Sequence, residues 1–168
     1  MTEPLSRDDR TRLRDIYLDD HWAGAAAGLA LASRLAEENA DSSWGVELAL
    51  ISNQINDDRQ ALADIRRLLH CDGGALKKAL ALVGERLSRL KPNGRITRYS
   101  PLSRVLELEA LISGVAAKQR LWVALHEFDQ GRGPLADFDF RELEARAVSQ
   151  LELLGSVHET AVIDLFGG

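Results

Sequence analysis

The chain has 168 residues and a formal net charge of −5, which is the length of one ordinary domain and a charge that argues against general affinity for nucleic acid. Its one cysteine, Cys71, excludes an internal disulfide and is typical of a reducing compartment, so we expect a cytoplasmic protein. The N-terminal segment is charged where a signal peptide is apolar. The longest apolar run, residues 22–32, is too short to span a bilayer, so we expect no membrane role.

The first predicted helix follows a short flexible segment, residues 1–5, begins at a capping box formed by Ser6 and Asp9, and ends near Asn39. Spacings of three and four residues predict one buried stripe along this helix: Leu13, Ile16, Tyr17, Asp20, Gly24, Ala27, Leu31 and Leu35. Small side chains at residues 23–28 predict that another helix packs tightly against its middle, without a ligand.

The second predicted helix begins after residues 41–43 and ends at the glycine pair 73–74. Its apolar stripe includes one carboxylate, Asp58. A third, shorter helix is predicted from Leu76 to Leu90, with its leucines on one side and most of its charges on the other. The turn Lys91-Pro92-Asn93-Gly94 ends it.

The next long helix is predicted to begin at Ser100-Pro101, because serine caps helices and proline fits their first position. It should end near Gln130, before a break at residues 131–134 that contains two glycines and a proline. Asp139, with Glu142 three residues later, indicates the start of the last helix, which ends at Phe166. We find no strand pattern.

The connection lengths predict how these helices are arranged. The first two long helices and the last two are joined by short connections, which produce antiparallel hairpins. Residues 72–100 are long enough to return along the whole bundle. We therefore expect an all-α, single-domain protein over residues 1–168, a four-helix bundle of two antiparallel hairpins with a long crossover that contains a fifth, shorter helix.

Each long helix carries one titratable residue in its apolar stripe: Asp20, Asp58, Glu109 and His158. A buried carboxylate without a partner is unfavourable, so these residues are paired, bound to a metal, or not buried. Equal distances from the hairpin turns place Glu109 within about a turn of His158, and Asp20 about a turn from Asp58. Arg59 or Arg66 could pair with Asp58. We expect Lys118 to be exposed.

Two helical hairpins, a returning connection and inward carboxylates resemble the ferritin-like superfamily. That resemblance implies a site for iron or manganese with Asp20, Asp58, Glu109 and His158 as ligands. The Glu-x-x-His motif of its diiron members would need glutamate where this chain has Gly155 and histidine where it has Ala61.

The stretch from Lys77 to Arg104 contains eight basic residues and one acidic residue, Glu85, so it carries +7 and the rest of the chain −12. It is either a solvated surface or a docking site for an anion or an acidic protein partner. Only Tyr99 lies among these basic residues, which does not suit binding of single-stranded nucleic acid. The candidate anion-binding residues are Arg86, Arg89, Lys91, Arg95, Arg98 and Arg104.

The sequence contains no phosphate-loop, dinucleotide-binding, zinc-protease or serine-hydrolase motif. We therefore expect a bundle that acts by association and not by catalysis, without a cofactor, as a homodimer. Four aromatic residues are candidates for exposed contacts: Trp122, Phe128, Phe138 and Phe140. Two alternatives stay open, a ferritin-like metal-binding protein or oxidase, and an anion-binding protein that uses the basic stretch.

Overall fold

The computed structural model describes residues 5–71, 99–131 and 133–167. These residues form long helices and no strand, as predicted. The helices are α1 (Arg7–Glu38), α2 (Gly45–Leu68), α4 (Pro101–Asp129) and α5 (Phe140–Phe166). None of the described helices combines the length and the apolar character needed to cross a bilayer.

Three helix starts are confirmed by their caps. The hydroxyl of Ser6 accepts the backbone N–H of Asp9 at 3.1 Å, and Ser100 caps α4 through the N–H of Ser103, also at 3.1 Å. Asp139 accepts the N–H groups of the second and third residues of α5 at 3.1 and 3.0 Å. Each cap satisfies N–H groups that have no partner inside the helix, which fixes where the helix begins.

The end of α2 differs from the prediction. The helix ends at Leu68, before the glycine pair, because His70 adopts a left-handed conformation with φ 52°. The N–H of His70 donates to the carbonyl of Arg67 at 3.2 Å, and that of Cys71 to Arg66 at 3.0 Å. This pattern is a Schellman motif with histidine in the position that glycine usually occupies.

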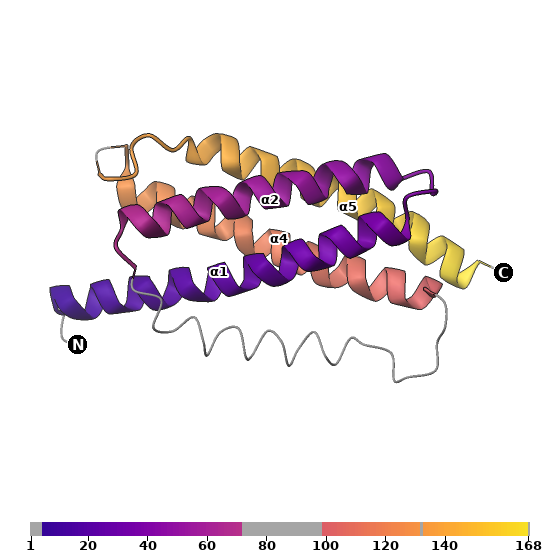
Figure 1. Cartoon of the computed structure of the whole chain (residues 1–168), viewed down its shortest axis with the longest axis horizontal. Coiled ribbons are helices and arrows are strands. Elements are labelled where there is room, and N and C mark those ends of the chain that lie inside the picture. Colours follow the sequence, from indigo (N-terminus) through magenta and orange to yellow (C-terminus); the bar gives the residue numbers. More distant parts are fainter. Residues whose placement is uncertain (1–4, 72–98, 132, 168) are drawn as a thin grey trace.

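The helices pack as two hairpins, α1 with α2 and α4 with α5, and α1 also packs along α4 (Figure 1). Leu69 accepts a hydrogen bond from Arg14 at the start of α1, whereas Tyr99 lies 3.4 Å from Asn39 at the end of α1. The described residues on either side of positions 72–98 therefore lie at opposite ends of the molecule. The predicted crossover and fifth helix fall on those positions, outside the described residues.

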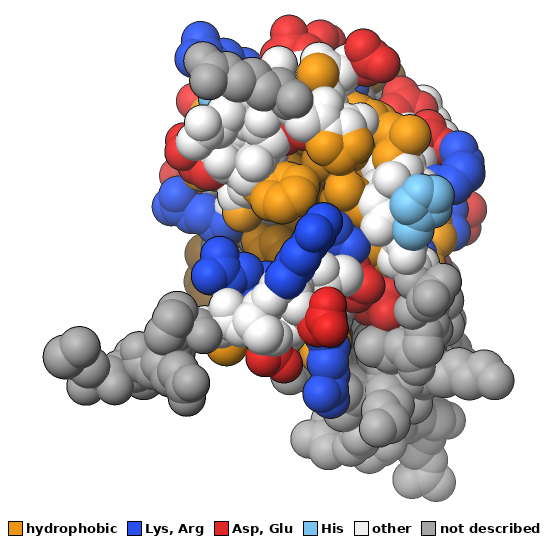
Figure 2. Space-filling model, turned by 90° about the vertical axis from the view of Figure 1, so that its left-hand side faces the viewer, with side chains coloured by type: hydrophobic (Ala, Val, Ile, Leu, Met, Phe, Trp, Pro, Cys, Tyr) orange, Lys and Arg blue, Asp and Glu red, His pale blue; other side chains and the backbone are white. Residues whose placement is uncertain are grey.

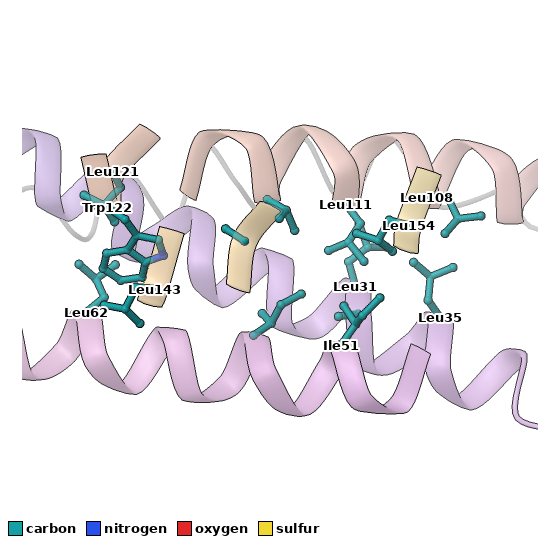
Figure 3. Packing of buried hydrophobic residues seen from close by; sticks show 14 of the residues in the cluster. Leu31, Leu35, Ile51, Leu62, Leu108, Leu111, Leu121, Trp122, Leu143 and Leu154 are labelled. Carbon is teal, nitrogen blue, oxygen red and sulfur yellow. The ribbon is translucent and has the colours of Figure 1, made fainter. Parts of the chain in front are cut away.

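Leucine-rich layers from all four helices fill the interior (Figure 3). The predicted stripe is wrong in the first half of α1, where Leu13, Ile16 and Tyr17 are 51%, 37% and 39% exposed. Leu18 and Asp19 are buried there in their place. On this side of α1, Leu18 packs into the core and Asp19 pairs with Arg66 of α2.

Candidate functional site

A pocket of about 400 Å³ lies between α1, α2 and α4. Small residues form its sides, with Gly24 and Gly28 on α1 and Gly114 on α4. A Cβ atom added to any of these three glycines would meet no atom within 4 Å. The predicted tight packing is found at Ala23, which is 1% exposed, but not at Gly24 and Gly28, whose missing side chains leave open space.

A buried carboxylate on α2 lies beside this space. Asp58 is 1% exposed, and it accepts hydrogen bonds from Arg146 of α5, at 2.9 Å from Nε and 2.5 Å from Nη2. Its other oxygen pairs with the ammonium group of Lys118 of α4. The prediction that Arg59 or Arg66 pairs with Asp58 is wrong, since both of its cationic partners come from the other hairpin.

Lys118 also differs from the prediction, because its side chain is only 16% exposed. Its ammonium donates to Oε1 of Gln150 at 2.5 Å, and the amide of Gln150 donates to Gln54 of α2 at 3.0 Å. Burial lowers the pKa of Lys118, and the negative charge of Asp58 opposes that shift. This network ties α2, α4 and α5 together at mid-length.

The indole of Trp122 forms part of the pocket wall one helical turn beyond Lys118. It is 1% exposed, and its Nε1 has no acceptor among the described residues. Because Nε1 is itself buried, it faces packed protein and not the open part of the pocket.

The four candidate metal ligands do not come together. Asp20 lies at the pocket but is exposed, and Asp58 is occupied by two cations. Glu109 and His158 do meet as predicted, with 3.3 Å between Oε1 and Nε2, on a surface where the glutamate is 54% exposed. Within residues 5–71, 99–131 and 133–167, no three His, Cys, Asp or Glu side chains are placed to hold a metal ion.

Five of the six candidate anion-binding residues, from Arg86 to Arg98, lie outside the described residues. The sixth, Arg104, donates from Nε to Asn39 at 2.7 Å and lies over the ring of Trp44, 5.0 Å from its centre. It is thus part of the packing where α1 turns into α2.

Glu107 is a buried residue that the sequence analysis missed. It is 4% exposed, pairs with Arg34 at 3.3 Å, and accepts the hydroxyl of Tyr99 at 3.2 Å. Burial raises the pKa of Glu107, and burial also raises the pKa of Tyr99 to about 12. These side chains join α1 to the start of α4.

Two aromatic candidates for exposed contacts are buried, since Trp122 is 1% and Phe140 4% exposed. Phe138 is half-buried, and only Phe128, at 53%, is exposed as predicted. Both buried rings belong to the hydrophobic core.

Comparisons with family models, with curated proteins and with solved structures found no match to this chain. The ferritin-like resemblance therefore stays a prediction from helix order and connection length.

Proposed function

We propose that this protein binds a small, largely apolar molecule in the pocket between α1, α2 and α4, and that it acts by binding and not by catalysis. One observation carries the proposal: the pocket between three helices has a mostly apolar lining, and a Cβ atom at its glycines Gly24, Gly28 and Gly114 would meet no atom within 4 Å. The volume, about 400 Å³, is within the range of small-molecule sites.

The shape of the pocket favours an elongated ligand. Its lining on α4 extends from Ala110 to Trp122, which is roughly 18 Å at the usual rise per residue. Aliphatic side chains such as Leu62 and Leu121 line it, so most of the ligand surface would be apolar.

The state of Asp58 supports a role without catalysis. Both of its oxygens accept hydrogen bonds from cationic side chains, so this carboxylate is engaged in holding the bundle together. We also propose that no resident metal or other cofactor is needed and that the protein is cytoplasmic.

The binding proposal is tested by calorimetric titration with decanol, an uncharged molecule with an apolar chain. We expect the wild type to bind decanol and the variant Gly28→Leu to bind it at least tenfold more weakly, because the new side chain fills the pocket. Gly155→Leu is the matched control, since a Cβ at this α5 glycine also meets no atom within 4 Å but lies outside the pocket. Equal affinity of both variants, or no binding by the wild type, would overturn the proposal.

We also propose that residues 72–98 connect opposite ends of the bundle. The contacts Arg14–Leu69 and Tyr99–Asn39 support a connection between opposite ends of the bundle, as the predicted crossover requires.

A second candidate function is association with a second copy of this chain. Figure 2 shows the end of the bundle where α1 begins and α2 ends, and apolar side chains gather in its middle among charged ones. Leu68 and Phe128, near the ends of α2 and α4, are 48% and 53% exposed. Light scattering of the wild type should give the mass of a dimer. The double variant Leu68→Ser, Phe128→Ser should give the mass of a monomer. A monomeric wild type would contradict this second candidate function.

A further inference from the structure

The polar residues that line the pocket gather near one end of it. Three ion pairs between helices show which residues lie at the same level along the bundle: Asp19 with Arg66, Arg34 with Glu107, and Asp58 with Lys118. Counted from these pairs at the usual rise per residue, the polar lining residues lie within about two helical turns of one another. We call this part the polar end of the pocket, and its residues are Asp20 and His21 on α1, Asp58 and Arg59 on α2, and Lys118 on α4.

The other half of the pocket is apolar. It extends on α4 from Ala117 to Ala110, roughly 10 Å at the usual rise per residue. On α1 it is lined by Ala27, Gly28 and Leu31. No polar side chain lines this half among the residues that the structure describes. A pocket with a polar end and an apolar half fits an amphiphile, because the polar group and the apolar chain each meet a matching surface.

The buried ion pairs leave no charge free at the polar end. Asp58 and Lys118 both line the pocket and pair with each other. Arg146, the second cation that pairs with Asp58, belongs to α5, which contributes none of the described lining residues. Both oxygens of Asp58 already accept hydrogen bonds from these cations. A charged ligand would therefore compete with an existing ion pair for its partner.

The remaining charges at the polar end also balance. Asp20 and Arg59 carry opposite charges, and the guanidinium of Arg59 lies over the ring of Trp22, 4.4 Å from its centre. Burial lowers the pKa of His21, which favours its uncharged form, although Asp20 opposes this shift. The formal charges of the described lining residues thus sum to zero. An ion would lose hydration here without meeting a net opposite charge, whereas a hydroxyl group can both accept and donate hydrogen bonds.

We propose that the ligand is an uncharged amphiphile, such as a medium-chain alcohol, whose hydroxyl group lies at the polar end and whose chain extends along the apolar half toward Leu31. The inference rests on the proposed function and adds to it the charge of the ligand and its orientation in the pocket.

The charge of the ligand is tested by calorimetric titration of the full chain with decanol, decanoate and decylammonium, which have the same chain length. We expect decanol to bind at least tenfold more tightly than either ion, because the ions lose hydration without compensation. Equal or tighter binding of either ion would overturn the inference that the ligand is uncharged and leave the pocket proposal standing. If none of the three compounds binds, the proposed function fails as well.

The variant Asp20→Lys tests where the polar group lies. Asp20 is exposed, so the substitution leaves the core intact, and it changes the summed charge of the lining residues from zero to +2. We expect this variant to bind decanoate at least fivefold more tightly than the wild type does, and decanol equally well, because the new cation lies beside the carboxylate.

Glu37→Lys is the matched control. It makes the same change of charge at an exposed position of α1, but it lies outside the pocket and beyond the apolar half. It should change the affinity for neither compound. A gain in decanoate affinity that is equal in the two variants, or larger in Glu37→Lys, would overturn the proposed orientation.

Discussion

Asp58 forms the buried ion pairs that connect the two hairpins. It lies at 1% exposure on α2, while its cationic partners come from α4 and α5. Such a pair contributes little net stability compared with apolar packing, but removing one partner leaves the other charges buried and uncompensated. The carboxylate therefore links the two hairpins in one arrangement.

We expect Asp58→Asn to lower the free energy of unfolding by about 3 kcal/mol, because Lys118 and Arg146 lose the negative charge that offsets their burial. Asp57→Asn is the matched control, since Asp57 is the exposed neighbour, and it should change stability by less than about 0.5 kcal/mol. Urea denaturation followed by circular dichroism measures both values. Equal effects of the two substitutions would show that the ion pairs do not matter for stability.

Tyr99 makes stability depend on pH in the alkaline range. Burial raises its pKa from 10.0 to about 12, so in this window the unfolded chain loses the phenol proton while the folded protein keeps it. The folded state then binds more protons, and stability falls as pH rises from 10.0 toward about 12. The contribution is fully present below pH 10.0.

The variant Tyr99→Phe should lose less stability than the wild type over that window, because it has no phenol to ionise. Urea denaturation at several pH values measures the difference between the two proteins. Parallel pH dependences would mean that Tyr99 titrates normally in the folded state.

At the scale of the helices, the sequence predicted the starts better than the faces. Ser6, Ser100 and Asp139 are local signals whose side chains cap the backbone a few residues away, so no distant contact was needed. The end of α2 was missed because a histidine, not a glycine, takes the left-handed position. The buried face of α1 was missed because the pair between Asp19 and Arg66 forms across two helices.

The sequence does contain a signal for the buried network. Lys118 follows Leu111 and Val115 and precedes Trp122 at spacings of three and four, so it belongs to the apolar stripe of α4. Gln150 occupies the same kind of position between Ala147 and Leu154 on α5. The pocket had no such signal, since small residues predict close packing and open space equally well until the distance between helix axes is known.

Glycines inside helices weaken them, and the pocket explains why α1 tolerates two. Gly28→Ala should raise the free energy of unfolding by about 0.5–1 kcal/mol, because alanine favours the helix and its Cβ meets no atom within 4 Å. Gly45→Ala should destabilise the protein, since a Cβ there would collide with the backbone carbonyl of Ala40. Thermal unfolding of both variants provides the measurement, and a loss of stability in Gly28→Ala would mean that the space is filled.

At the scale of the molecule, polar contacts connect the two hairpins at two levels, and the pocket lies between α1, α2 and α4. Near one end, Arg34 of α1 pairs with Glu107 of α4. At mid-length, Asp58 of α2 pairs with Lys118 of α4 beside the pocket. The space therefore lies between elements that are fixed on both sides, which favours a preformed site over one that opens on binding.

The central claim is that an apolar molecule enters this space, and methyl NMR during a decanol titration tests it most directly. We predict chemical-shift changes at the methyl groups of Leu62, Leu111 and Leu121, which line the pocket, and little change at Leu48 and Leu143, which are buried elsewhere. Shifts spread evenly over buried and exposed methyl groups, or confined to the exposed Leu13 and Leu68, would contradict the account.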